Sequence, residues 1–142
     1  MRSKPNRLAI LVAAASLIAG CATAGRSATS AIGGAEWHAI EIDGTPAVPS
    51  EINQRPSLRV DVDSARVSGS AGCNRFGGTA TMSGETIRFS KLISTRRACI
   101  DEQRNRQETR YLAALEAIDR YSISGDTLTL LSSGRPRAKL TR

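Results

Sequence analysis

The three cysteines carry the most reactive side chains of this sequence, and each lies in a different setting. Cys21 directly follows Leu17-Ile-Ala-Gly20, which ends an apolar run in small residues. This pattern is typical of bacterial lipoprotein precursors, which are cut before a cysteine whose thiol receives a diacylglyceryl group. We therefore expect cleavage before Cys21 and lipidation of its side chain.

Cys73 and Cys99 remain after lipidation, an even pair in a chain expected to enter an oxidising compartment. A disulfide between them would close a loop of roughly 25 residues and stabilise the domain by about 3–4 kcal/mol. Two separate buried thiols are the alternative interpretation. A metal site is not expected, because two cysteines and the distant His38 do not supply four ligands.

An enzymatic site would need a nucleophile, a base and a group that orients the base. His38 is the single histidine, and it lies next to Trp37 on a predicted strand. No serine lies in a Gly-x-Ser-x-Gly elbow, and Gly69-Ser-Ala-Gly72 is too short for a phosphate loop. Asp61 and Asp63 are paired carboxylates on the exposed face of one strand. The sequence therefore predicts neither catalysis nor a bound cofactor.

The basic character of the chain is reduced once the N-terminal segment is removed. The whole chain has 20 Lys and Arg against 13 Asp and Glu, and three of the basic residues lie in residues 1–20. Nucleic acid is not expected as a partner, because the chain is predicted to be exported and contains 4% aromatic residues. A mildly basic surface suits anionic lipid or a cell-wall polymer. Arg-rich usage in the genome is the simpler alternative.

Three segments follow from composition. Residues 1–20 form a predicted signal peptide, in which a basic start precedes an apolar run shorter than the roughly 20 residues of a transmembrane helix. Residues 21–35 are small and polar without periodicity, which predicts a flexible tether. Residues 36–142 form the predicted folded domain. Ala22, directly after the lipidated cysteine, favours the outer membrane, with the domain anchored there and facing the periplasm.

Alternation of apolar and polar residues predicts strands through most of the domain. It is clearest at residues 58–63, where Leu58, Val60 and Val62 share one face. In the first strand Trp37, Ala39 and Ile42 point inward with a slip in the alternation. Gly125-Asp126 marks a two-residue hairpin between the strands at 121–124 and 127–131. Further predicted strands lie at residues 66–70, 76–82, 85–90, 92–95 and 136–141.

One helix of about four to five turns is predicted within residues 101–120, which contain neither Gly nor Pro. The apolar residues recur at three- and four-residue spacing, while Gln107 falls on the polar side with the arginines. Asp101 and Glu102 lie where the helix dipole favours negative charge. The apolar positions are Tyr111, Leu112, Ala114, Leu115 and Ile118. The fold class is therefore α+β: a small, curved or barrel-like, mainly antiparallel sheet of about eight strands with one late amphipathic helix.

Several motifs resemble the META domain, also called the HslJ-like family. Val67 to Gly78 contains Gly-Cys-Asn-Arg-Phe-Gly-Gly, which is similar to the "GCN-x-F-x-G" signature of that family. Ser94 to Cys99 is similar to the "ST-R-x-A-C" element, with Arg97 where relatives more often have Met. Glu108 to Leu115 resembles the "E-x-x-F/Y-L-x-x-L" helix, and the closing hairpin also matches. The resemblance covers residues 36–141.

The resemblance implies a compact β-rich envelope lipoprotein without assigned catalytic residues, in a family partly linked to heat shock or drug tolerance. We therefore expect a non-catalytic role in envelope stress or drug tolerance. The alternative is a periplasmic module that binds one unknown protein partner, such as an inhibitor or assembly factor. The signature itself is expected to be structural, with Gly72 and Gly77-Gly78 fitting close or strained backbone.

A ligand site is the alternative role for the signature. Its candidate residues are Asn74, Arg75, Arg96 and Arg97, which could hold an anionic group by charge-assisted hydrogen bonds. Glu108 is expected nearby as their counter-charge, in a plain salt bridge.

Overall fold

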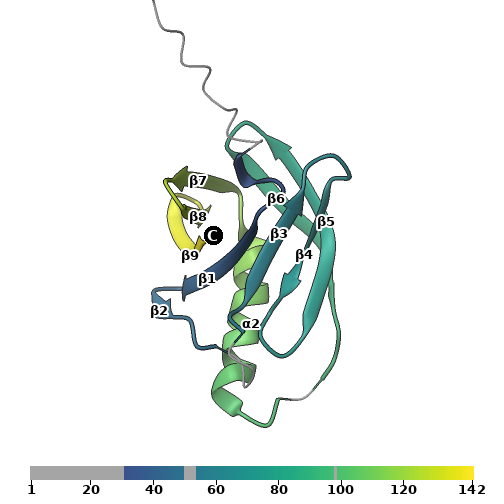
Figure 1. Cartoon of the computed structure of the whole chain (residues 1–142), viewed down its shortest axis with the longest axis vertical. Coiled ribbons are helices and arrows are strands. Elements are labelled where there is room, and N and C mark those ends of the chain that lie inside the picture. Colours follow the sequence, from purple (N-terminus) through teal and green to yellow (C-terminus); the bar gives the residue numbers. More distant parts are fainter. Residues whose placement is uncertain (1–30, 50–53, 98) are drawn as a thin grey trace, which may run out of the picture.

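The computed structural model describes residues 31–49, 54–97 and 99–142 (Figure 1). Nine strands form one antiparallel sheet in the order β2-β1-β3-β4-β5-β6-β7-β8-β9, and β1 also pairs with β9. The strands are β1 Glu36–Ile42, β2 Thr45–Pro46, β3 Ser57–Asp61, β4 Arg66–Ser70, β5 Arg75–Ser83, β6 Thr86–Ser94, β7 Arg120–Ser124, β8 Thr127–Ser132 and β9 Arg135–Thr141. The β1–β9 pairing bends the sheet into a near-barrel, so the predicted fold class is confirmed.

The strand count differs from the prediction at two places. Residues 85–90 and 92–95, predicted as two strands, belong to the single strand β6. Lys91 adopts a positive φ of 53°, and the β5–β6 register shifts between Gly77 and Thr79, so the strand bends there without ending. The short strand β2 was not predicted, because Gly44 and Pro46 read as a break in the sheet.

Alternation correctly placed the inner face of the first strands. Trp37, Ala39 and Ile42 are at most 1% exposed. The predicted slip appears as a register shift between Ala39 and Glu41 in the β1–β9 ladder. Val62 was wrongly placed inside. It lies one residue beyond the end of β3 and is 37% exposed, because the chain turns there toward β4.

The helix α2 spans Glu102–Ala117. Its N-cap is Asp101, whose carboxylate accepts hydrogen bonds from the backbone N–H groups of Gln103 and Arg104. The helix ends three residues before Arg120, the last residue of the range in which it was predicted, because Ile118 is extended and Arg120 already begins β7. The stretch without Gly or Pro continues beyond the last residue of the helix. The end of the helix is instead fixed by the pairing of β7 with its neighbouring strands.

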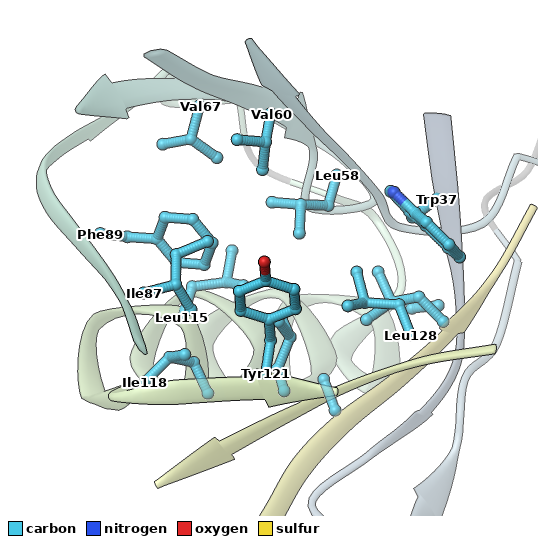
Figure 2. Packing of buried hydrophobic residues seen from close by; sticks show 14 of the residues in the cluster. Trp37, Leu58, Val60, Val67, Ile87, Phe89, Leu115, Ile118, Tyr121 and Leu128 are labelled. Atoms are coloured by element: carbon cyan, nitrogen blue, oxygen red, sulfur yellow. The ribbon is translucent and has the colours of Figure 1, made fainter. Parts of the chain in front are cut away.

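Helix α2 crosses the opening between β6 and β7, the two strands that it connects (Figure 1). Those strands meet at Thr86 and Arg120. The helix fills the barrel with Tyr111, Ala114 and Leu115, all fully buried. Figure 2 shows side chains of the strands and the helix directed into one common interior. The sheet contributes most of that core: Trp37, Leu58, Val60, Val67, Phe76, Ile87, Phe89, Tyr121, Leu128, Leu130 and Leu140.

The folded domain begins before the predicted Glu36. Ile32 is fully buried, and its carbonyl accepts a hydrogen bond of 3.0 Å from the indole N–H of Trp37. Gly33 bridges to Val60 of β3. Residues 31–35 therefore belong to the domain, which corrects the end of the predicted tether. The predicted signal peptide and Cys21 lie outside the described residues. No helix in the described part of the chain is long and apolar enough to cross a membrane.

Candidate functional site

The signature residues meet the helix entrance at one end of the barrel. Cys73 and Cys99 form a disulfide with a Cα–Cα distance of 5.9 Å, within the usual range. In this structure the two cysteines are thus paired and are not two separate thiols. The bond joins the connection between β4 and β5 to the segment that leads into α2.

Asn74 is a buried hydrogen-bond hub beside this disulfide, 5% exposed. Its amide group donates to the carbonyl of Arg97 at 3.0 Å and to Oε1 of Glu108. Its side-chain oxygen accepts from the Thr95 hydroxyl at 3.0 Å and from the Arg97 backbone N–H at 2.7 Å. An asparagine side chain has two donors and two acceptor positions, and all four are used internally. Asn74 therefore has a structural role, and its side chain has no hydrogen-bond donor or acceptor left for a ligand.

Glu108 is not the salt-bridge partner that the sequence predicted. Its Oε2 accepts hydrogen bonds from the backbone N–H groups of Cys73 at 3.0 Å and Asn74 at 2.8 Å. Among the described residues, no arginine lies within ion-pair distance of this carboxylate. Two backbone N–H groups and one amide take the place of the expected arginine. The glutamate thereby ties α2 to the β4–β5 connection.

The neighbouring Gln107 also contradicts its predicted position on the polar face, since it is 2% exposed. Its amide donates to the carbonyl of Val48 at 2.8 Å and accepts from the Val48 backbone N–H at 2.7 Å. A glutamine that satisfies an isolated backbone segment can be buried at little cost. Helical periodicity could not find this pairing, because Val48 is 59 residues away in sequence.

The signature glycines have distinct roles. A Cβ on Gly78 would lie 2.7 Å from the Ser90 carbonyl oxygen, which leaves no room for a side chain. Gly72 has a φ of 121°, so its backbone is also restricted to glycine. Gly77 meets nothing closer than 3.7 Å, so the predicted steric need holds for Gly78 and not for Gly77. Gly69, which the sequence did not single out, is the most crowded, because a Cβ there would lie 2.0 Å from the Ser57 carbonyl oxygen.

The three candidate arginines lie on two adjoining segments, since the Arg75 backbone is hydrogen-bonded to Thr95, directly before Arg96. Arg96 and Arg97 are exposed on the segment between β6 and α2. Only the backbone of Arg97 takes part in the Asn74 network. Arg75 is exposed at the start of β5, and its side chain lines a separate hollow on the outer face of the sheet. Ligand binding by these arginines remains a prediction.

This hollow was missed from the sequence. It has a volume of about 800 Å³ and crosses the outward face of β9, β1, β3, β4 and β5. Strand register brings Thr141, His38, Ser57, Ser70 and Arg75 into one row across the five strands. The lining residues are Glu36, His38, Gln54, Arg55, Ser57, Arg59, Ser68, Gly69, Ser70, Arg75, Thr141 and Arg142. Alternation placed Arg59 on the outward face of its strand, but it could not show which strands are neighbours.

Arg142 lies at the rim of the hollow in two contacts. Its guanidinium carbon lies 5.2 Å from the centroid of the Trp37 ring, in a cation–π arrangement. Its Nε also lies 3.2 Å from Oδ1 of Asp126. The single tryptophan of the chain therefore lies directly beneath an arginine of this hollow.

Three titratable groups have shifted pKa values for local reasons. The pKa of Arg137 is raised, chiefly because its guanidinium donates a hydrogen bond to the Asp43 carboxylate. The pKa of Asp61 is lowered, chiefly because its carboxylate accepts a hydrogen bond of 3.1 Å from the backbone N–H of Ser64. Burial raises the pKa of Tyr111 far above its usual value. The hydroxyl of Tyr111 has no hydrogen-bond partner among the described residues.

No metal centre is found within residues 31–49, 54–97 and 99–142. No three His, Cys, Asp or Glu side chains of these ranges lie close enough together to hold an ion. His38 is exposed in the polar row, and Cys73 and Cys99 are used by the disulfide.

Comparisons with solved structures agree on the fold. One NMR structure shares 21% identity at a TM-score of 0.64, over 80% of this chain and 92% of that chain. A second, of a protein from Burkholderia xenovorans, shares 22% identity at a TM-score of 0.64, over 100% of this chain and 98% of that chain. A crystal structure of a DUF4847 family protein from Bacteroides vulgatus shares 12% identity at a TM-score of 0.51, over 78% and 92%. Likeness at these identities shows the fold alone.

The family model gives the more specific result. No curated protein matches the chain. The META domain model matches residues 30–142, which include the disulfide, the Asn74 hub and α2. Its start at residue 30 also agrees with the burial of Ile32. The chain belongs to the META domain family.

Proposed function

We propose that this protein is a non-catalytic lipoprotein of the cell envelope that contributes to stress or drug tolerance. In this proposal a lipid on Cys21 holds it to the membrane, by preference the outer membrane, with the META domain facing the periplasm. The observation that carries the proposal is the internal use of the family signature. The side chains of Asn74 and Glu108 form their hydrogen bonds within the protein. Residues bonded in this way hold segments of a structure together, whereas a catalytic residue needs groups that can reach a substrate.

Two further features support an envelope location. The Cys73–Cys99 disulfide fits an oxidising compartment outside the cytoplasm. The small residues before Cys21 fit lipoprotein processing. A diacylglyceryl group supplies two acyl chains, which suffice for stable membrane attachment.

The test compares a deletion strain with strains that express the wild-type protein or the Cys21→Ser variant. Survival would be measured under heat, detergent and hydrophobic antibiotics. We expect the deletion to be more sensitive, the wild-type gene to restore tolerance, and the unanchored variant to restore it incompletely. Wild-type tolerance in the deletion strain under all three conditions would refute this function.

A second candidate is an interaction module for one protein partner. It is favoured by Ile93 and Ile100, which are 76% and 95% exposed on either side of the segment carrying Arg96 and Arg97. Apolar side chains so exposed near basic residues are typical of contact surfaces. In-cell crosslinking followed by mass spectrometry would test this function. We expect Ile93→Ser with Ile100→Ser to abolish capture of one dominant partner, and Val62→Ser, at 37% exposure, to preserve it.

A further inference from the structure

We propose that the hollow on the outer face of β9, β1, β3, β4 and β5 binds a phosphate-bearing ligand through Arg55, Arg59 and Arg75. Arg75 belongs to the signature, and its backbone N–H donates to the Thr95 hydroxyl of the Asn74 network, but this residue also lines the hollow. The proposed site does not depend on the function proposed above. The row formed by Thr141, His38, Ser57, Ser70 and Arg75 makes up its floor.

The shape of the hollow suits a small ligand. Its volume of about 800 Å³ lies within the range of roughly 300–1,000 Å³ found for ligand pockets. The floor of the hollow is rigid, because its five strands are joined by four consecutive strand pairings. Donors carried by adjacent strands keep their spacing, which lowers the entropic cost of binding.

The charge of the hollow is strongly positive. Four arginines line it, against Glu36 as the one acidic residue. Arg55, Arg59 and Arg75 are exposed and make no ion pair with any described residue. Some arginines elsewhere on the surface are paired with carboxylates, as Arg106 is with Glu102, while others, such as Arg88, have no ion pair with a described residue. In the hollow only Arg142 has such a partner, Asp126, so within the described part of the chain three of its four arginines have no carboxylate partner.

Two carboxylates lie near Arg59. Glu36 is its partner in the β1–β3 register, and Asp61 shares the outward face of β3 with it. Arg59 contributes to the lowered pKa of Asp61, although the main cause is the hydrogen bond of 3.1 Å that Asp61 accepts from the backbone N–H of Ser64. Neither carboxylate forms an ion pair with Arg59, so its guanidinium donors can still reach a ligand.

The polar side chains of the floor add donors. Ser57 Oγ accepts the Ser70 backbone N–H at 3.3 Å, and Ser70 Oγ accepts the Gly72 backbone N–H at 3.2 Å. Because each hydroxyl is used there as an acceptor, its O–H is still able to donate. A phosphate has several acceptor oxygens and up to two negative charges, so it can accept hydrogen bonds from two or three guanidinium groups at once. A monocarboxylate can bind only one guanidinium group in the bidentate arrangement.

The fluorescence of Trp37 can report ligand binding in the hollow. Trp37 is its single tryptophan, and Arg142 at the rim of the hollow lies 5.2 Å from the ring centroid. A ligand that draws Arg142 toward the hollow would alter this contact and shift the fluorescence of Trp37.

The experiment uses the full-length protein as isolated from cells, solubilised in a neutral detergent. Inorganic phosphate and acetate are titrated separately, with calorimetry and Trp37 fluorescence as readouts. A second arm adds mixed micelles with or without phosphatidylglycerol, which separates a soluble phosphate from a lipid headgroup. The test variant is Arg59→Gln with Arg75→Gln. The control is Arg88→Gln, an exposed arginine of β6 outside the hollow.

We expect saturable binding of phosphate or of the phosphatidylglycerol micelles, weaker binding of acetate, and at least about tenfold weaker affinity in the double variant. Circular dichroism would verify that the double variant folds, and Arg55→Gln gives an independent test. Binding in solution would identify a free phosphate compound as the source, and binding to micelles alone a lipid headgroup. Equal affinity for acetate, no saturable binding in either arm, or an equal loss in Arg88→Gln would overturn the proposal.

Discussion

Single residues at the disulfide end of the barrel show how the META signature acts. Asn74 and Glu108 come from segments 34 residues apart, yet they are joined by both backbone and side-chain hydrogen bonds. Each polar atom of the pair is satisfied by the other or by a nearby backbone group. A fully satisfied buried network fixes one arrangement of its segments, because each broken bond leaves a costly unpaired group.

Glu108→Gln is the direct test of this network. A glutamine offers one acceptor oxygen, so its amide would face either the N–H groups of Cys73 and Asn74 or the Asn74 amide. We expect the free energy of unfolding in urea to fall by about 2–3 kcal/mol. Glu116→Gln, exposed two turns further along the helix, should change it by less than about 0.5 kcal/mol. Equal effects of the two variants would exclude a special role for Glu108.

The two tyrosines predict opposite effects of the same substitution. Tyr111 buries a hydroxyl without a partner among the described residues, whereas the Tyr121 hydroxyl donates to the Gly84 carbonyl at 3.1 Å. We expect Tyr111→Phe to raise the free energy of unfolding by about 1 kcal/mol and Tyr121→Phe to lower it by a similar amount. A loss in Tyr111→Phe as large as that in Tyr121→Phe would contradict this prediction.

Tyr111 also predicts how stability depends on pH. Burial raises its folded-state pKa, so above about pH 10 the unfolded chain loses a proton that the folded protein keeps. The stability linked to Tyr111 is therefore complete below pH 10 and falls as the pH rises further, by about 1.4 kcal/mol per unit. Urea unfolding between pH 9 and 11 should show this decline in the wild type and a shallower decline in Tyr111→Phe.

At the scale of elements, α2 is held at its first turns and packed along its length. Asp101 caps it, Gln107 binds the Val48 backbone, and Glu108 binds the β4–β5 connection. These contacts place the helix across the β6–β7 opening, where Tyr111 meets Phe76 edge-on with ring centroids 6.1 Å apart. The closed sheet and the helix thus depend on each other for a filled interior.

The disulfide should contribute measurably to this arrangement. Its two cysteines are 26 residues apart, which corresponds to about 3.5 kcal/mol in the chain-entropy description. We expect Cys73→Ala with Cys99→Ala to lose about that much in urea unfolding. Reductant should destabilise the wild type to the same extent and leave the double variant unchanged. A double variant as stable as the oxidised wild type would show that the bond adds nothing to the fold.

At the scale of the whole molecule, the two ends of the barrel differ in their chemistry. Gly33 bridges to Val60 near the end of β3, at the barrel end where the described chain begins. The disulfide and the segment with Arg96 and Arg97 lie at the other end, beside the start of α2 (Figure 1). A chain anchored through Cys21 would therefore present the disulfide end away from its point of attachment.

Processing of the N-terminus is the prediction that belongs to this scale. The intact mass of protein isolated from membranes should correspond to residues 21–142 with a diacylglyceryl adduct, less about 2 Da for the disulfide. Cys21→Ser should appear without the adduct and shift to the soluble fraction. A wild-type mass that retains residues 1–20, or that carries no lipid, would refute the anchor.

The sequence by itself determined the fold class, the inner faces of the strands, the cysteine pair and the family signature. Each is encoded locally, by alternation, by turn residues or by a short motif. Tertiary structure alone decided which strands are neighbours, and with that the polar row, the hollow and the crowding of Gly69 against Ser57.

It also decided the partners of Gln107 and Glu108. Helical spacing had assigned Gln107 to the polar face, and Glu108 had been expected to pair with the candidate arginines. The physical reason is that a hydrogen bond depends on which groups meet in space. Local patterns state only whether a side chain points inward or outward. The polar partners that it finds there are set by how the whole barrel closes.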